Sequence, residues 1–307
     1  MSKIAFIYPG QGAQKSGMGA DFYENSVSVR KIFDKASEVL DLDMKALCFE
    51  PNDRLDITEY TQAALVTTCL AMTKVVEEKG LKPDAAAGLS LGEYCAISAA
   101  GGMDEMDAIR LVRKRGILMQ NTVPAGEGGM CAILAMEAEE IERILEKTED
   151  VTIANYNCPG QIVITGKKEA VEKAAEKLKE AGAKRTMMLN VSGPFHSPLL
   201  EAAGEELGKE LEQVELHTLT IPYYTNVTAG KVVDIAETKA LLEQQVSASV
   251  KWMQSVEQMI ADGIDTFVEI GPGKTLAGFM KKINRDVKVY NIGTWEDVER
   301  VVEELTC

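Results

Sequence analysis

Histidine is nearly absent from this sequence of 307 residues, which has only two, His196 and His217. The six cysteines are scattered, with no C-x-x-C pair and no histidine at metal-binding spacing. This pattern argues against a structural zinc site and is typical of reduced thiols in a cytoplasm. No apolar run approaches the roughly 20 residues that a membrane-spanning helix needs, so we expect no membrane partner and a cytoplasmic location.

Basic residues are also in the minority. The chain has 33 lysines and arginines against 48 aspartates and glutamates, a formal net charge of −15 at pH 7. A nucleic-acid partner needs a positive surface, so we expect none. The composition, 46% hydrophobic and 26% charged, is that of a globular protein with a large core, in one domain with an insertion or in two domains. Residues 4–8 are predicted to form a strand that Pro9 interrupts too soon for a signal peptide.

The segment Gly88-Leu89-Ser90-Leu91-Gly92 fits the G-x-S-x-G pattern of a nucleophile elbow. A short apolar run precedes it and a helical pattern follows it, and the motif requires this strand–turn–helix setting. The sharp turn lifts the serine hydroxyl clear of the sheet, and the helix start supplies free N–H groups and a positive dipole end. We therefore predict that Ser90 is a nucleophile. The alternative is a glycine–serine turn that links a strand to a helix without catalysis.

A serine nucleophile needs a general base, and histidine is the usual one. His196 lies between Pro194 and Pro198 in a constrained loop that suits a fixed imidazole, whereas His217 lies in a plain polar–apolar stretch. We therefore favour His196 as the base. No acidic residue between Ser90 and His196 stands out as a third member of a triad.

Two glycine-rich segments look like phosphate-binding loops but depart from those motifs. Segment 10–15 has Lys15 where the last glycine of G-x-G-x-x-G belongs. Segment 271–275 looks like the end of a P-loop, but Val268 stands where its first glycine should be. We therefore expect no nucleotide-binding loop.

Strands and helices alternate along most of the chain, which indicates an α/β fold with a parallel sheet covered by helices. In the first part we expect strands at 4–8 and 85–89 and helices at 27–40, 62–79, 93–100 and 105–123. In the last part we expect helices at 198–213, 239–245, 250–261 and 275–283 and strands at 221–226 and 266–270.

The middle of the chain has its own pattern after the glycine-rich segment 125–129. There we expect strand 130–136, helix 138–147, a hairpin of 151–156 and 161–165, helix 168–181 and strand 184–191. This β-α-β-β-α-β order is ferredoxin-like. A small insert within a larger α/β domain leaves a cleft, where ligands often bind. Ser90 precedes the insert and His196 lies at its exit.

Several motifs occur together in the order of a known family. The sequence resembles the malonyl-CoA:acyl-carrier-protein transacylases of type II fatty acid synthesis over nearly its whole length. The motifs are Gly10-Gln11-Gly12-Ala13-Gln14, Gly88-Leu89-Ser90-Leu91-Gly92-Glu93-Tyr94, Arg115-Gly116 with Met119-Gln120, Asn155-Tyr156-Asn157-Cys158-Pro159-Gly160-Gln161, Gly193-Pro194-Phe195-His196-Ser197, Asn226-Val227-Thr228-Ala229 and Glu269-Ile270-Gly271-Pro272-Gly273. The resemblance implies an α/β-hydrolase-like large subdomain, residues 1–126 and 198–307, with an inserted ferredoxin-like small subdomain, residues 127–197.

The resemblance also implies roles for residues around the nucleophile. Ser90 would attack the thioester carbonyl of malonyl-CoA, and His196 would take the serine proton and return it to the leaving thiolate. A main-chain carbonyl, matched here by Gln245, would steady the histidine in place of a carboxylate. The backbone N–H groups of Gln11 and Leu91 would hold the oxyanion.

The resemblance further implies that two residues select the acyl group. Arg115 matches the residue that anchors the malonyl carboxylate, for which a guanidinium fork is well suited. Without the family match, a solvated helix charge beside Arg113 and Lys114 is the simpler interpretation. Phe195 matches the residue that fills the space an α-methyl branch would need. One departure is Leu89, where the family commonly has histidine.

We therefore predict an enzyme that moves malonyl from malonyl-CoA to the phosphopantetheine thiol of acyl carrier protein, without a cofactor beyond the coenzyme A thioester. Alternatives are a trans-acting acyltransferase that serves a polyketide synthase, a serine thioesterase or other hydrolase, and a non-catalytic interaction module. An acidic carrier protein would need a local basic surface on this acidic chain. The candidates for that surface are Lys184, Arg185, Lys281, Lys282 and Arg285.

Overall fold

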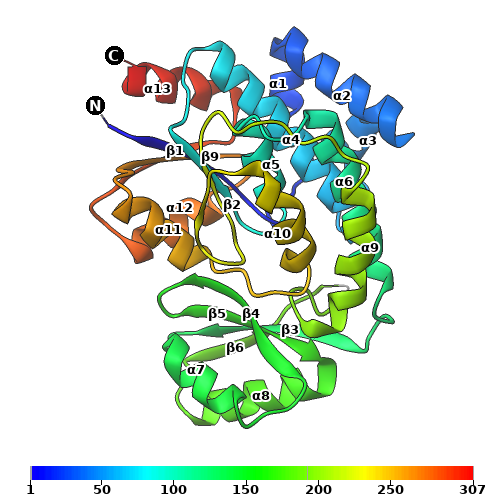
Figure 1. Ribbon diagram of the computed structural model, residues 1–307, viewed down its shortest axis with the longest axis vertical. Helices are drawn as coiled ribbons and strands as arrows, with labels where there is room; N and C mark the ends of the chain where they lie inside the picture. The colour runs from blue at the N-terminus through cyan, green and yellow to red at the C-terminus, as the bar shows by residue number, and fades with distance from the viewer. Residues whose placement is uncertain (1, 192, 307) are drawn as a thin grey trace.

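The computed structural model describes residues 2–191 and 193–306, and these form an α/β fold with two sheets (Figure 1). Positions 1, 192 and 307, which fall in the predicted subdomains, lie outside the described residues. The larger sheet has six strands in the order β10-β9-β1-β2-β7-β8. All its pairings are parallel except that of β8 with β7. The predicted α/β fold with a mostly parallel sheet is therefore confirmed. Its strands are β1 (Ile4–Tyr8), β2 (Ala85–Gly88), β7 (Tyr223–Tyr224), β8 (Lys231–Val232), β9 (Thr266–Ile270) and β10 (Lys288–Ile292).

Both faces of the larger sheet are covered, and β1 shows this most directly. Alternate residues of a strand point to opposite faces. Phe6 and Tyr8 belong to one buried cluster, with residues of α4 (Thr58–Glu78) and α5 (Gly92–Ala99). Ala5 and Ile7 belong to a second cluster, with α11 (Trp252–Ala261) and α12 (Thr275–Ile283). A continuous apolar strand is expected when helices cover both faces of a parallel sheet.

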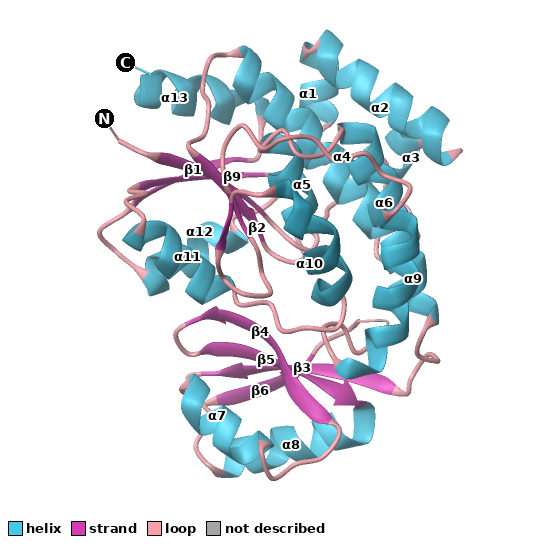
Figure 2. Ribbon diagram, viewed as in Figure 1, coloured by secondary structure: helices cyan, strands magenta, loops and turns pink. Residues whose placement is uncertain are grey.

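The smaller sheet lies at the other end of the molecule, below the larger one in Figure 2. Its strand order is β4-β5-β3-β6, all antiparallel pairs, and its helices pack on one face over a separate apolar core. The two parts meet where Tyr156 N donates to Val250 O at 2.9 Å and Val250 N donates to Ala154 O at 2.7 Å. The elements in chain order are β3 (Gly128–Leu134), α7 (Ala138–Leu145), β4 (Val151–Cys158), β5 (Gln161–Lys167), α8 (Lys168–Glu180) and β6 (Arg185–Met188).

Some elements differ from the sequence-based expectation. Helix 198–213 is a short 3-10 turn followed by α9 (Glu201–Leu211), and strand 221–226 shortens to β7. The sequence interpretation also left out several short or terminal elements. The remaining helices are α1 (Ala20–Asn25), α2 (Val27–Leu40), α3 (Met44–Phe49), α6 (Glu105–Asn121), α10 (Thr238–Gln245), a 3-10 turn (Ile235–Glu237) and α13 (Trp295–Thr306).

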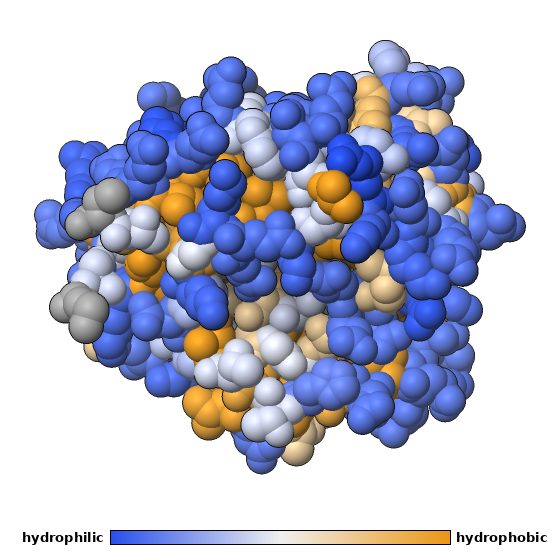
Figure 3. All heavy atoms as spheres, turned by 90° about the horizontal axis from the view of Figure 1, so that it is seen from above, coloured by the Kyte–Doolittle hydropathy of each residue, from blue (hydrophilic) through white to orange (hydrophobic). Residues whose placement is uncertain are grey.

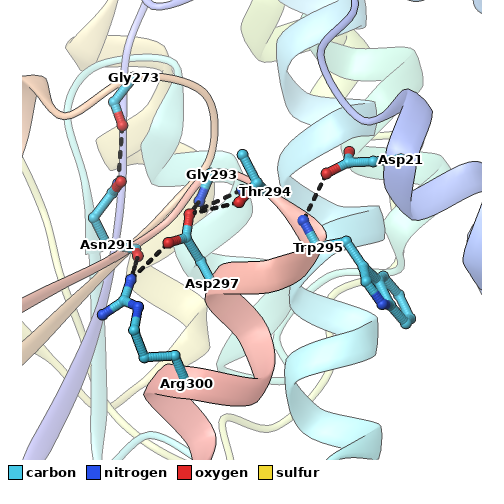
Figure 4. A network of polar contacts seen from close by, with 8 residues as sticks. All are labelled: Asp21, Gly273, Asn291, Gly293, Thr294, Trp295, Asp297 and Arg300. Carbon is cyan, nitrogen blue, oxygen red and sulfur yellow. Dashed lines mark hydrogen bonds and ion pairs between the residues drawn. The ribbon is translucent and has the colours of Figure 1, made fainter.

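The C-terminal segment fixes the loop that leads into α12. Asn291 of β10 donates from Nδ2 to Gly273 O at 2.9 Å (Figure 4). Asp297 accepts from two main-chain N–H groups at the start of α13, both at 3.1 Å, and Asp21 accepts from Trp295 N at 2.6 Å. These contacts join β10, α13 and α1 at one end of the molecule. That end is mostly hydrophilic, with apolar side chains visible between the polar ones (Figure 3).

Within the described part of the chain, no helix is long and apolar enough to cross a membrane.

Candidate active site

Ser90 lies at the sharp turn between β2 and α5. Its φ of +52° is in the left-handed region, which costs a non-glycine residue about 1–3 kcal/mol. A Cβ at Gly88 would collide with the main chain of Gly92, and a Cβ at Gly92 would collide with the main chain of Tyr8. The two flanking glycines are therefore required by close approach. Asn226 stabilises the turn, because its Oδ1 accepts from Ser90 N at 2.6 Å and its Nδ2 donates to Gly88 O at 2.8 Å.

His196 lies against the nucleophile, with 2.7 Å between its Nε2 and the Oγ of Ser90. Its Nδ1 is 2.9 Å from the main-chain oxygen of Gln245. A carbonyl oxygen only accepts, so Nδ1 carries the proton and the Nε2 lone pair faces the serine hydroxyl. Burial, together with the positive charge of Arg115, lowers the pKa of His196 to about 3. The imidazole is therefore neutral at pH 7 and able to accept the serine proton.

The second histidine lies elsewhere. His217 is partly exposed, and its Nε2 is 3.7 Å from a carboxylate oxygen of Asp104. The structure therefore places only the histidine favoured from the sequence beside Ser90.

Arg115 of α6 reaches the nucleophile from the side. Its Nη2 donates to Ser90 Oγ at 3.1 Å and to Gln245 Oε1 at 3.0 Å, and its Nη1 donates to Gln62 Oε1 at 2.9 Å. Only 1% of Arg115 is exposed, so the interpretation as a solvated helix charge is wrong. Burial lowers its pKa. Its Nε is buried and has no hydrogen-bond partner among the described residues.

Gln245, the last residue of α10, contacts each of the other three site residues. Its main-chain oxygen holds His196, its Oε1 holds Arg115, and its Nε2 donates to Ser90 O at 3.0 Å. The same Nε2 lies 2.6 Å from Glu93 Oε2. In this structure a main-chain carbonyl occupies the position that a carboxylate has in a serine triad.

The comparisons with known proteins agree over the whole chain. The profile of the acyl transferase domain family matches residues 5–301. A Bacillus subtilis (strain 168) protein, malonyl CoA-acyl carrier protein transacylase, is 44% identical, over 99% of this chain and 98% of the relative. The chain belongs to the malonyl CoA-acyl carrier protein transacylase family. This confirms the resemblance read from the ordered motifs.

Solved structures of the transacylase family have the same fold. The crystal structure of malonyl CoA-acyl carrier protein transacylase from Clostridium perfringens superposes with a TM-score of 0.95 at 41% identity, covering 99% of this chain and 98% of that one. A second structure, a type II polyketide-synthase acyl-carrier protein in complex with its malonyl-transacylase, gives a TM-score of 0.96 at 37% identity. It covers 99% of this chain and all of that chain (100%).

A pocket of about 250 Å³ opens in front of Ser90. Gln11 and Leu91 both line it, and no hydrogen bond among the described residues occupies either of their backbone N–H groups. Gly10 allows the main chain to approach, because a Cβ there would lie 2.7 Å from Leu89 O. Leu89, directly before the nucleophile, is itself part of the pocket wall.

The rest of the pocket wall is largely apolar and comes from both parts of the fold. Phe195, directly before His196, is 7% exposed and faces the pocket. The other apolar residues that line it are Pro9, Ala13, Met119, Met130, Val163, Leu189, Val191, Leu276 and Phe279. Within residues 2–191 and 193–306, no group of three or more His, Cys, Asp or Glu is placed to hold a metal ion.

Sequence reasoning assigned no role to three polar residues of the site. Gln62 contacts Arg115, Asn226 stabilises the elbow, and Glu93 contacts Gln245. Burial raises the pKa of Glu93 to about 7. Glu93 and Asn226 lie within the family motifs of the sequence analysis, and this position could have indicated a role in the site. Nothing in the sequence indicated a role for Gln62, because it lies within a helix of mostly apolar residues.

Proposed function

We propose that this enzyme transfers the malonyl group of malonyl-CoA to the phosphopantetheine thiol of acyl carrier protein, in fatty acid biosynthesis. One observation carries the proposal: a neutral His196 and a buried Arg115 both contact the hydroxyl of Ser90. The first makes the serine a nucleophile, and the second places a cation where a carboxylated acyl group would lie.

In the first half-reaction, Ser90 Oγ attacks the thioester carbonyl carbon and gives its proton to His196 Nε2. The carbonyl carbon forms a bond to Oγ, and its bond to the coenzyme A sulfur breaks. The thiolate then takes the proton from His196, which returns to its neutral form. The contact of Nδ1 with the Gln245 carbonyl favours the imidazolium in between.

The oxyanion of the tetrahedral intermediate needs donors that are already in place. The N–H groups of Gln11 and Leu91 are the candidates, since both residues line the pocket and no described group occupies these donors. The Leu91 N–H also lies at the start of α5, where the helix dipole favours negative charge.

Arg115 would bind the free carboxylate of the malonyl group. Five N–H bonds are present on a guanidinium, and three are used here, so two remain for a ligand. The Ser90 hydroxyl no longer exists once it is esterified, and Gln62 and Gln245 still hold the guanidinium in place. Phe195 limits the space beside the acyl chain, which favours malonyl over branched groups.

In the second half-reaction, the phosphopantetheine thiol gives its proton to His196 and attacks the malonyl ester. The ester bond to Oγ breaks, and the serine recovers the proton from His196. These steps require no cofactor beyond the coenzyme A thioester substrate. The partners are malonyl-CoA and acyl carrier protein.

Two alternatives concern the acceptor. The solved complex of a related transacylase with a polyketide carrier protein makes a polyketide-synthase carrier a second candidate. Water as acceptor would make the enzyme a hydrolase. The buried guanidinium of Arg115 in the pocket wall favours transfer, because it suits a carboxylated acyl group such as malonyl.

We also infer how the fold divides. An α/β-hydrolase-like subdomain, residues 1–126 and 198–307, and a ferredoxin-like subdomain, residues 127–197, are supported by the two separate sheets and by the strand order β4-β5-β3-β6. A cytoplasmic location is supported by free, buried thiols at Cys48, Cys69, Cys95, Cys131 and Cys158.

The proposal is tested by incubation with malonyl-CoA, followed by intact-protein mass spectrometry and then by addition of a fatty-acid or polyketide holo-carrier protein. We expect an ester on Ser90 that the carrier protein removes. Rapid release of free malonate without a carrier would identify a hydrolase. Neither ester nor malonate would refute catalysis at Ser90.

A further inference from the structure

Behind the pocket wall lies a buried carboxyl group that the reaction steps above do not use. Glu93 is in the first turn of α5 and has no exposed surface (0%). Its Oε2 accepts from Gln245 Nε2 at 2.6 Å and from Asn226 N at 3.0 Å. Its Oε1 has no hydrogen-bond partner among the described residues. Burying a carboxyl in this way costs folding free energy, so its position calls for a function.

The amide of Gln245 joins this carboxyl group to the cation of the site. Gln245 Oε1 accepts from Arg115 Nη2 at 3.0 Å, and Gln245 Nε2 donates to Glu93. The amide dipole therefore has its negative end on the guanidinium and its positive end on the carboxyl. Among the described residues, none of the direct ion pairs includes Arg115. Glu93, joined to Arg115 through one amide, is a carboxyl group whose charge interacts with the guanidinium.

This spacing solves a conflict in the site. An uncompensated buried guanidinium is costly, yet a carboxylate bonded directly to Arg115 would occupy the N–H groups that a substrate carboxylate needs. Placing the anion beyond Gln245 offsets the charge and leaves two guanidinium N–H bonds unused, Nε among them. Neither Glu93 nor Gln245 lines the pocket, so substrate does not compete with them.

Gln245 also carries His196 on its main-chain oxygen. A group that fixes Gln245 therefore fixes the base and the carboxylate anchor together. We propose that Glu93 is a positioning residue of the transfer reaction, which acts through the Gln245 amide as the indirect counter-ion of Arg115. This inference rests on the proposed malonyl transfer.

The groups that face Glu93 determine how the pH dependence can be read. Arg115 faces it from α6, Tyr94 follows it on α5, and Tyr223 approaches from β7. Burial raises the pKa of both tyrosines, so they stay neutral near pH 7, while the pKa of Glu93 rises to about 7. With the pKa of His196 at about 3, Glu93 is the group of this network that changes charge near neutral pH.

The test compares Glu93→Gln with the wild type in the acylation of Ser90 by malonyl-CoA and by acetyl-CoA, across about pH 5.5 to 8.5. The glutamine keeps an oxygen acceptor for Gln245 and Asn226 but removes the charge. We expect the acetyl rate to fall about tenfold more than the malonyl rate, because only malonyl brings its own carboxylate to Arg115. The wild-type rate should rise with pH through about 7, and this step should vanish in Glu93→Gln.

Glu269→Gln is the matched control. Glu269 is equally buried and accepts from the N–H groups of Leu276 and Ala277, without a contact to Gln245. Its substitution also removes a buried carboxyl group. It should leave the malonyl-to-acetyl ratio and the pH step unchanged, even where it lowers stability.

Equal loss of the malonyl and acetyl rates in Glu93→Gln, or persistence of the pH step in that variant, would overturn the inference. The proposed function would still stand as long as the wild type forms the malonyl ester. Absence of that ester in the wild type would instead refute the function. If Glu93→Gln does not fold, measurements on Glu93→Asp and on the wild type still test the inference. The wild type must show the step, and the aspartate, which keeps the charge, must retain both the step and the ratio within about twofold. A flat wild-type profile overturns the inference.

Discussion

The Nη2 of Arg115 lies 3.1 Å from the Oγ of Ser90, so the nucleophile and a buried cation are in direct contact. Few arrangements explain an arginine that is 1% exposed and has no carboxylate partner among the described ion pairs. A substrate that brings its own carboxylate to the serine is the simplest, because it gives the guanidinium the direct carboxylate partner that it lacks in this structure.

The first prediction concerns the covalent intermediate. Ser90→Ala should abolish labelling by malonyl-CoA, since no other group supplies the attacking oxygen. His196→Ala should slow labelling by about 10²–10⁴-fold, the usual range for loss of a general base. The measurement is intact-protein mass after incubation with malonyl-CoA. An ester that still forms at another residue in Ser90→Ala would show that the elbow was assigned wrongly.

Stability should depend on pH through His196. The histidine has a pKa of about 3 in the folded state and about 6.5 unfolded, so between these values the unfolded chain binds the extra proton. The contribution of His196 to the free energy of unfolding is complete above about pH 6.5. It is lost as the pH falls, because protonation then favours the unfolded chain. Relative to His196→Gln, the wild type should lose about 2 kcal/mol of unfolding free energy between pH 7 and pH 5.

Urea denaturation of both proteins at the two pH values checks this prediction. The comparison with His196→Gln cancels the opposing contribution of Glu93, whose raised pKa favours the folded state as the pH falls from about 7. A difference between wild type and variant that does not change with pH would contradict the buried, neutral histidine.

A third prediction places the carrier-protein surface. Lys281, Lys282 and Arg285 are exposed at the end of α12, and earlier residues of the same helix line the pocket. Lys282 Nζ is 3.5 Å from Gln161 Oε1, so this patch spans the junction between the two sheets. Charge reversal at Lys281 or Arg285 should weaken transfer to an acidic carrier protein and leave acylation by malonyl-CoA nearly intact.

Lys35→Glu is the matched control for that patch, because the Lys35 side chain is exposed and its helix, α2, lies at the far end from the smaller sheet (Figure 1). The two half-reactions are measured separately, with the carrier protein at low concentration. Equal losses in both half-reactions for every patch variant would mean that these residues do not dock the carrier. The second basic candidate, Lys184 and Arg185, is exposed beside β6 and is tested in the same way.

The local parts of the site could be predicted from the sequence because their geometry is local. The elbow needs only a strand, two glycines and a helix start, and these are contiguous. Arg115 is different: its neighbours Arg113 and Lys114 are also basic, and only tertiary packing decides that Arg115 alone is buried against the serine. The family resemblance, rather than its own sequence pattern, singled it out.

Glu93 and Gln245 show the limit more clearly. They are 152 positions apart in the chain and are joined by a single side-chain contact that no periodicity encodes. The edge strand β10 was not predicted from the sequence, because most of its residues are partly exposed and do not form a long apolar run. β7 shortened because only Tyr223 and Tyr224 pair with β2, whereas the apolar pattern extends further.

The most direct test of the account is the selection of malonyl by Arg115. Acylation of Ser90 is measured at low malonyl-CoA and at low acetyl-CoA, in the wild type, Arg115→Ala and Arg115→Lys. Two charged hydrogen bonds of about 1.5–3 kcal/mol each supply on the order of a hundredfold or more in discrimination. We predict that the malonyl rate falls steeply in Arg115→Ala while the acetyl rate holds or rises, and that Arg115→Lys recovers only part of the preference. A parallel fall for both substrates would contradict the account, because Arg115 would then support the fold or the coenzyme A moiety instead of the acyl carboxylate.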